Sequence, residues 1–312
     1  MWWTVSRHYA GLAIAHQGAI EAARDIFDAS MPILAEMGDL WTGNALGVRA
    51  TAMLAAGEVA EADGASALGW EQLQPNPIHQ HRHVYLRAEV ALARGDLPAA
   101  RQWADEAVSV AAGWYQVLAL TARARVAIAQ DDPDLAERDA HDALVSAAGL
   151  GALLGVPDLL ELLAILAHDA ERYPEAARLF GAAEALRQRM GAVRFKIYGA
   201  DHDRAVARLR EAVGDNEFDA AWAEGVAMST EESIAYAQRG RGQRRRARSG
   251  WGSLTPTERA VVELVSEGLA NKAIAAKLFI SLRTVESHLT HVYTKLGLSS
   301  RVQLAQAAAR HR

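Results

Sequence analysis

Short polar side chains gather on one side of a predicted helix over residues 282–296. Val285, Leu289, Val292 and Leu296 recur at helical spacing, so they form an apolar stripe that must face a core. The residues opposite or beside this stripe carry donors and acceptors: Arg283, Glu286, Ser287, Thr290, His291 and Thr294. Arginine binds guanine edges, serine and threonine several bases, and glutamate the cytosine amino group. The pattern predicts contacts with base edges; the alternative is an ordinary solvated helix face.

The residues before this helix predict a first, well-capped helix. Thr255 is a predicted N-cap, Pro256 takes the first helical position, and Glu258 completes a capping box. Gly268 ends the helix. Its apolar positions are Val261, Val262, Leu264 and Val265. This helix is expected to be amphipathic and to supply part of a small core.

A second helix and a tight turn complete the arrangement. Asn271 is a predicted N-cap, and Ile274, Ala275 and Leu278 are expected to face inward. Only residues 279–280 separate this helix from Ser281, the predicted cap of the third helix. Two helices joined by a tight turn predict a helix-turn-helix, whose second helix enters the major groove. A fourth helix is predicted over residues 300–310.

Charge divides the chain. Residues 239–312 carry 14 Arg and Lys against four acids, a net charge of +10, whereas residues 1–238 carry −15. A basic end on an acidic body is typical of a protein that meets a polyanion. The Arg-rich segment 239–250 lacks apolar periodicity and is predicted to be a flexible tether that contacts phosphates. The alternative is a solvated run that improves solubility.

Composition excludes several classes of protein. The chain has 312 residues and no cysteine, which excludes a disulfide scaffold, a Cys-ligated zinc module and a thiol nucleophile. The longest nearly uncharged run, residues 143–156, is too short to cross a hydrocarbon layer of about 30 Å. Neither a secretory signal nor a membrane span is expected. The sequence therefore predicts a soluble, cytoplasmic protein.

The acidic body over residues 1–238 is predicted to be all-α, because its apolar residues recur at three and four. Similar segments begin at Gly18, Gly57, Gly95, Asp131 and Arg172, which are 39, 38, 36 and 41 residues apart. Each segment follows another helical stretch. The unit is therefore a helix, a short turn and a second helix.

Hairpins of this kind must stack to bury their apolar faces, which predicts an α-solenoid. Small residues are expected at the close helix contacts: Ala22, Ala62, Ala100, Ala136 and Ala177. The array resembles a degenerate tetratricopeptide repeat, although its period is longer than the usual one. A non-repeating, Ala-rich helical bundle is the alternative.

The last sixty residues resemble the LuxR/GerE-type helix-turn-helix family. The matching positions, in order from residue 254 to residue 301, are LTPTE, EG, NK and IA around residue 273, L and IS around residue 279, TV and the following H, and KLG and SR. The resemblance implies sequence-specific binding to double-stranded DNA, usually by a dimer on inverted half-sites. It departs from the family at Leu282 and Ala273, where proline and glutamate are usual. In relatives the fourth helix often forms the dimer contact.

The resemblance also assigns roles to individual residues. Base edges would be read by Glu286, Ser287 and Thr290. The DNA backbone would be contacted by Asn271, Lys272, Thr284, Lys295 and Arg301. Arg283 and His291 join the base-reading set from the helix periodicity described above.

Residues 175–191 and 211–237 resemble the region that precedes the DNA-binding end of large ATP-binding LuxR-type regulators. A P-loop is absent, since Gly-Lys never occurs in the sequence. ATP-driven switching within this chain is therefore not expected. A further possibility is that the chain is the C-terminal part of a longer regulator whose ATPase is absent or separately encoded.

Other candidate sites are weaker. His79, His81 and His83 form the only histidine cluster. A metal site would need a further ligand, and no HExxH pattern accompanies these residues, so a loop that begins a helix is favoured over a metal site. No nucleophile elbow or paired carboxylates stand out. We expect no enzyme activity and no cofactor.

Together these patterns predict a transcriptional regulator with three parts: a helical-repeat sensor or interaction domain (1–238), an Arg-rich linker (239–250) and a DNA-binding domain (251–312). A small molecule or protein bound to the body is expected to change how two DNA-binding domains pair. RNA polymerase is a further expected partner. The alternative is a helical interaction scaffold whose terminal domain does not bind DNA specifically.

Overall fold

The computed structural model describes residues 2–246, 251, 254, 256–278 and 282–311. The chain divides into two compact units, Met1–Ala237 and Gln238–Arg312. Every regular element of the described residues is helical, which confirms the all-α prediction. No helix among these residues combines the length and apolarity needed to cross a membrane.

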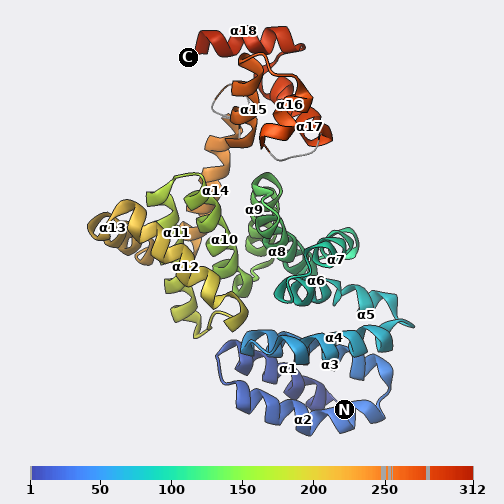
Figure 1. Ribbon diagram of the computed structural model, residues 1–312. Helices are drawn as coiled ribbons and strands as arrows, with labels where there is room; N and C mark the ends of the chain where they lie inside the picture. The colour runs from blue at the N-terminus through green and yellow to red at the C-terminus, as the bar shows by residue number, and fades with distance from the viewer. Residues whose placement is uncertain (1, 247–250, 252–253, 255, 279–281, 312) are drawn as a thin grey trace. The chain divides into compact units, whose positions relative to one another are not determined.

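The first unit, the helical body, is an array of helical hairpins in which each hairpin packs on the next (Figure 1). The hairpins are formed by α1 (Trp2–His16) with α2 (Ile20–Glu36), α3 (Asp39–Ala56) with α4 (Val59–Leu73), α6 (Val84–Ala93) with α7 (Leu97–Val110), α8 (Trp114–Ala129) with α9 (Pro133–Leu150), and α10 (Val156–Asp169) with α11 (Tyr173–Met190). The short helix α5 (Pro77–His81) and the 3-10 turn η1 (Leu153–Gly155) lie in the connections.

The turn inside each hairpin has the same backbone geometry. Its left-handed residue is Gly18, Gly57, Gly95, Asp131 or Glu171. In each turn the following residue donates its N–H to the carbonyl five residues earlier, at 2.8–3.2 Å. This is the Schellman bond that closes a helix C-terminus. Glycine adopts the left-handed conformation without strain, which is why three of the five segments were recognisable as glycine turns.

The left-handed residue sets the register of the next helix. Five residues after it stands a fully buried alanine in every hairpin: Ala23, Ala62, Ala100, Ala136 and Ala176. The predicted contact at Ala22 is wrong, because Ala22 is exposed and its neighbour Ala23 is buried instead. Ala177, which was counted from Arg172, is also buried.

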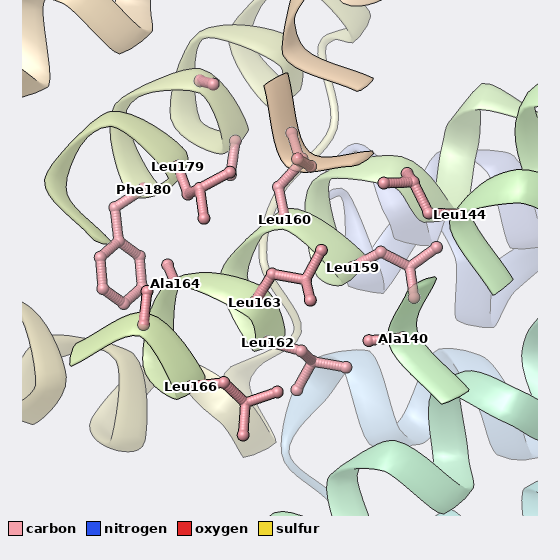
Figure 2. Packing of buried hydrophobic residues seen from close by; sticks show 14 of the residues in the cluster. Ala140, Leu144, Leu159, Leu160, Leu162, Leu163, Ala164, Leu166, Leu179 and Phe180 are labelled. Carbon is pink, nitrogen blue, oxygen red and sulfur yellow. The ribbon is translucent and has the colours of Figure 1, made fainter. Parts of the chain in front are cut away.

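Helix α10 is the centre of the largest core. Ten of its 14 residues are buried, so it is apolar almost all round, as expected for a helix covered on several sides. Figure 2 shows leucines 159, 160, 162, 163 and 166 of this helix packed among residues of α9 and α11. Glu161 is the one carboxylate buried within this apolar helix.

Three more helices complete the body: α12 (Lys196–Val213), α13 (Asp215–Val226) and the first part of α14 (Thr230–Arg246). Helices α11 and α13 meet backbone to backbone. A Cβ on Gly181 would lie 2.3 Å from the carbonyl oxygen of Trp222, and one on Gly225 would lie 2.0 Å from that of Arg178. Only glycine fits at these two contacts.

Helix α12 does not intervene between α11 and α13. The segment before it returns to the first hairpin, where the N–H of Val193 donates to the carbonyl of His16 at 2.8 Å. Helix α12 itself packs against α3, α10, α11 and α13, and Leu209 is its one buried residue.

Two histidines of the cluster lie within hydrogen-bond distance of Asn44. Nδ1 of His79 lies 3.2 Å from Nδ2 of Asn44, and Nε2 of His83 lies 3.2 Å from Oδ1 of Asn44. Nδ1 of His83 is buried without a hydrogen-bond partner among the described residues, against Gly47. Across the same residues, no group of three or more His, Asp or Glu side chains is placed to hold a metal ion.

Acidification is expected to destabilise the body through His83. Burial lowers the pKa of His83 to about 4, and Arg82 and His79 act in the same direction. The imidazole of His83 therefore binds a proton at a higher pH in the unfolded chain than in the folded chain, so acid favours unfolding. The contribution of His83 to the free energy of unfolding is present above about pH 6.5 and is lost as the pH falls, by about 2 to 3 kcal/mol between about pH 7 and about pH 4.5.

Urea unfolding of the full chain at both pH values, with and without His83→Gln, measures this contribution. Burial also lowers the pKa values of His8 and His16, so both proteins should lose stability in acid. The loss should be smaller in the His83→Gln protein. An equal loss in the two proteins would show that His83 does not control it.

The second unit has four short helices after the end of α14: α15 (Pro256–Ser266), α16 (Asn271–Leu278), α17 (Leu282–Leu296) and α18 (Arg301–His311). All four contribute to one core, which includes Val261, Ile274, Val285, Val292 and Leu304. The apolar positions predicted for the first three helices are buried or packed against this core.

The Arg-rich segment is helical in its first part. Helix α14 continues to Arg246, so residues 239–246 are not the irregular tether that the missing apolar periodicity predicts. Arginine has a high helix propensity, and extending an existing helix avoids the cost of nucleation. Residues 247–250 lie outside the described part of the chain.

Candidate nucleic-acid interface

Helix α17 has one buried and one exposed side. Val285, Leu289 and Val292 are at most 5% exposed and face the core of the second unit. The exposed side chains include Glu286, Thr290, His291 and Thr294, as the helical periodicity predicts. Because α16 and α15 both pack on α17, the core side is fixed and the polar side remains open to solvent.

The hydroxyl groups of two exposed threonines donate hydrogen bonds within the helix. Oγ1 of Thr290 donates to the carbonyl of Glu286 at 3.0 Å, and Oγ1 of Thr294 donates to the carbonyl of Thr290 at 3.0 Å. Their oxygen lone pairs stay available, and the nearby Glu286 carboxylate also accepts. This part of the face therefore offers acceptors, which match the amino groups of adenine and cytosine in the major groove.

Some predicted contact residues cannot be placed in full. Arg283 and Ser287 lie on α17, but the positions of their side chains are outside the described part of the structure. Lys272 is exposed on the first turn of α16, and Thr284 is half-buried on the first turn of α17. The predicted caps Thr255 and Ser281 also lie outside the described residues.

Lys295 is held inside the domain. Its Nζ lies 3.0 and 2.8 Å from the two carboxylate oxygens of Glu258, whose side chain is 3% exposed. The pair joins α15 to α17. Glu258, which was predicted to close a capping box, is an ion-pair partner of α17. The Lys295 ammonium group is therefore used in the ion pair with Glu258.

Arg301 joins α18 to the start of α16. Its guanidinium donates to Oδ1 of Asn271 at 2.8 Å and to the carbonyl of Leu269. Asn271 does not cap α16, contrary to the prediction. The carbonyl of Ala270 accepts from the N–H groups of residues 273 and 274, so Ala270 occupies the cap position. The Asn271 side chain is used for the tie to Arg301 instead.

The predicted set therefore separates into two groups. Lys272, Glu286, Thr290 and His291 are exposed and available to a ligand. Lys295, Arg301 and Asn271 tie helices together in two pairs, α15 with α17 and α16 with α18. Sequence reasoning missed these ties because their partners are 37 and 30 residues apart, and no local spacing signals such pairs.

The C-terminal unit is similar in sequence to a known family of regulatory proteins. Residues 252–308 match the family described as bacterial regulatory proteins, luxR family. The oxygen regulatory protein NreC of Staphylococcus aureus is 47% identical over 55 residues, which are 18% of this chain and 25% of that protein. The likeness to that protein thus covers little more than the size of a helix-turn-helix domain.

Two mycobacterial relatives match almost the whole chain. Each is named as a candidate HTH-type transcriptional regulator, one from Mycobacterium bovis and one from Mycobacterium tuberculosis. Each is 53% identical over 297 residues, which are 95% of this chain and 34% of the relative. The chain thus spans about a third of the length of these relatives. No solved structure matches it.

Proposed function

We propose that this chain, whose C-terminal unit contains a LuxR-family helix-turn-helix domain, binds specific DNA sequences and thereby regulates transcription. The observation that carries the proposal is the exposed polar side of α17, which includes Glu286 and Thr290 and lies opposite the buried side chains of Val285, Leu289 and Val292. Polar groups held on a rigid helix can select base edges, whereas a loop would have to be ordered first.

In the proposed complex α17 lies in the major groove. Glu286 and Thr290 accept hydrogen bonds from base amino groups, Arg283 donates to guanine, and Ser287 and His291 contact neighbouring bases. Lys272 and Thr284 contact phosphates. The net charge of +10 on residues 239–312 adds a sequence-independent attraction. Lys295, Arg301 and Asn271 act through the helix packing, and any phosphate contact they make requires their present partners to be shared.

The body and the pairing of two chains complete the proposal. Two copies bind inverted half-sites, and a small molecule or protein bound to the helical body changes how the two DNA-binding units pair. RNA polymerase is the proposed downstream partner. The names of the relatives support regulation as the function, and no catalytic role is proposed for any residue.

The proposal is tested by selecting bound fragments of the source genome with the full chain across a salt series. We expect a common inverted-repeat sequence to be enriched, with affinity that falls steeply as salt rises. Salt-sensitive binding without enrichment of a common sequence would mean that the Arg-rich segment only contacts phosphates. The absence of binding would instead favour the interaction-scaffold alternative.

A further inference from the structure

A cavity of about 460 Å³ lies in the helical body, between α12 on one side and α6, α8 and α10 on the other. Its apolar lining comes from all four helices and includes Leu92, Ile128, Leu162, Ile165 and Ile197. Cavities of this volume accept small organic molecules. The cavity is therefore large enough for a ligand and offers it apolar surface from four helices.

Helix α12 buries little of its own surface. Leu209 is its one buried residue, and its apolar lining residues Ile197 and Ala205 are only partly buried. Most of neighbouring α11, in contrast, is buried. A molecule in the cavity would cover the apolar side chains that α12 leaves partly exposed, so binding should stabilise this helix.

The carboxylates in the lining already have partners. Asp158 accepts hydrogen bonds from Arg125 and Arg187. Glu161 accepts from Arg187 and Arg194. The other two carboxylates pair within their own helices or next to them in sequence: Asp169 with His168, and Asp201 with Arg204. None of these four carboxylates is therefore free to select a cationic ligand.

Two other polar groups of the lining lack such partners, and both lie on α12. Arg208 is exposed and forms neither an ion pair nor a hydrogen bond with any described residue. The His202 side chain is 11% exposed, and its Nδ1, at 3.6 Å from Oε1 of Glu161, makes no hydrogen bond with a described residue. A mostly buried polar group without a partner is uncommon. Both side chains can donate to an acceptor on a ligand.

The sign of the unpaired charge indicates which ligand fits. Arg208 is always protonated, and a guanidinium binds a carboxylate through two parallel hydrogen bonds. Residues 1–238 carry −15 as a whole, but at physiological ionic strength exposed charges more than about 8 Å apart are largely screened. The nearest unpaired charge therefore decides, and it is positive. A molecule with an apolar body and one carboxylate matches this cavity.

We propose that the cavity between α12 and α6, α8 and α10 binds a small amphipathic carboxylate, whose apolar body contacts the leucine and isoleucine lining and whose carboxylate pairs with Arg208. This deepens the sensing role in the proposed function and rests on that function only for its effect on DNA. Binding of the carboxylate itself is measured without DNA, so failure of either idea can be recognised separately.

The test uses three probes that share an indole body and differ in charge: indole-3-acetate, tryptophol and tryptamine. Saturation-transfer NMR titrations with the full chain measure their affinities. We expect indole-3-acetate to bind best, tryptophol about threefold to fivefold more weakly, and tryptamine weakest, since an ion pair with an exposed arginine contributes modestly. Equal affinities, a preference for tryptamine, or no binding by any probe would overturn the proposal.

Removing the unpaired charge gives the sharpest check. Arg208→Gln should lower the affinity for indole-3-acetate about threefold to fivefold, to that of tryptophol, and leave tryptophol binding unchanged. The matched control is Arg138→Gln, which removes the same charge from an exposed arginine of α9 that lies outside the lining and has no ion pair with a described residue. It should change neither affinity. Equal losses in the two proteins would contradict a contact with Arg208.

Two further substitutions locate the apolar part of the site. Ala129 is exposed at the cavity wall, so Ala129→Trp should fill the space and abolish binding of indole-3-acetate. The matched control is Ala207→Trp, at an exposed alanine of α12 outside the lining, which should leave binding unchanged. Equal effects of the two substitutions would show that the carboxylate binds elsewhere.

Discussion

Replacing Lys295 with methionine is expected to lower the stability of the C-terminal unit by about 3 to 5 kcal/mol, the usual result of removing one partner of a buried ion pair. The Glu258 side chain is 3% exposed and holds Nζ of Lys295 with both carboxylate oxygens. Methionine keeps most of the volume of lysine but leaves that carboxylate without its ammonium partner. The contact that orders α15 against α17 is then lost.

Hydrogen exchange of the α15 and α17 amides in the full chain measures this effect. The control is Lys277→Met, because Lys277 is 57% exposed and lies 3.5 Å from a carboxylate of Glu267 that is 45% exposed. That surface pair should contribute less than about 1 kcal/mol. Combining Lys295→Met with Glu258→Leu should restore much of the protection. Similar exchange in the Lys295→Met and Lys277→Met proteins would contradict the proposed role of the buried pair.

Replacing Arg187 with methionine should have an effect of similar size on the body, about 3 to 5 kcal/mol. Arg187 is 4% exposed and donates to both Glu161 and Asp158. Without it Asp158 retains Arg125, and Glu161 retains Arg194. Two carboxylates in and beside the apolar helix α10 would each lose one cation.

Urea unfolding as a function of pH measures this second effect. Burial tends to raise the pKa of Asp158, but Arg125 and Arg187 outweigh burial and hold the pKa below its ordinary value. The stability from Asp158 is thus present above the ordinary pKa and is lost as the pH falls through the depressed one. In the Arg187→Met protein the pKa of folded Asp158 should lie closer to its ordinary value, so this loss should be smaller and should end at a higher pH.

The control for Arg187 is Arg49→Met. Arg49 is 28% exposed and pairs at 2.8 Å with an Asp28 side chain that is 65% exposed, so the change should be below about 1 kcal/mol. A small loss in the Arg187→Met protein, with an unchanged pH profile, would mean that Asp158 and Glu161 do not depend on Arg187 as a partner.

Much of the body follows from local signals in the sequence. The hairpin turns are recognisable because a left-handed residue favours glycine, as at Gly18, Gly57 and Gly95. The register within the next helix was predicted one residue out in the first hairpin, since Ala22 and Ala23 are both small and only the turn geometry distinguishes them. The helical course of residues 239–246 was missed because it depends on the helix that precedes it.

The candidate interface divides in the same way. The exposed side of α17 was predictable because helical periodicity separates Val285 and Leu289 from Glu286 and Thr290. The roles of Lys295 and Arg301 were not, because their partners come from distant parts of the chain. In the body, Asp158 and Glu161 stand among leucines in α10, and carboxylates in a mostly apolar helix were the signal that could have revealed the charge cluster around them.

The central claim is that α17 selects the bases that this chain binds. The most direct test repeats the selection of genomic fragments with Glu286→Ala and, as its matched control, Glu263→Ala, which changes an exposed glutamate on α15. The account predicts that Glu286→Ala relaxes the preference at one position of each half-site, at a cost of about 1 to 3 kcal/mol for the preferred base, while Glu263→Ala keeps the original sequence. An unchanged base preference in the Glu286→Ala protein would contradict the assignment of α17 as the recognition helix.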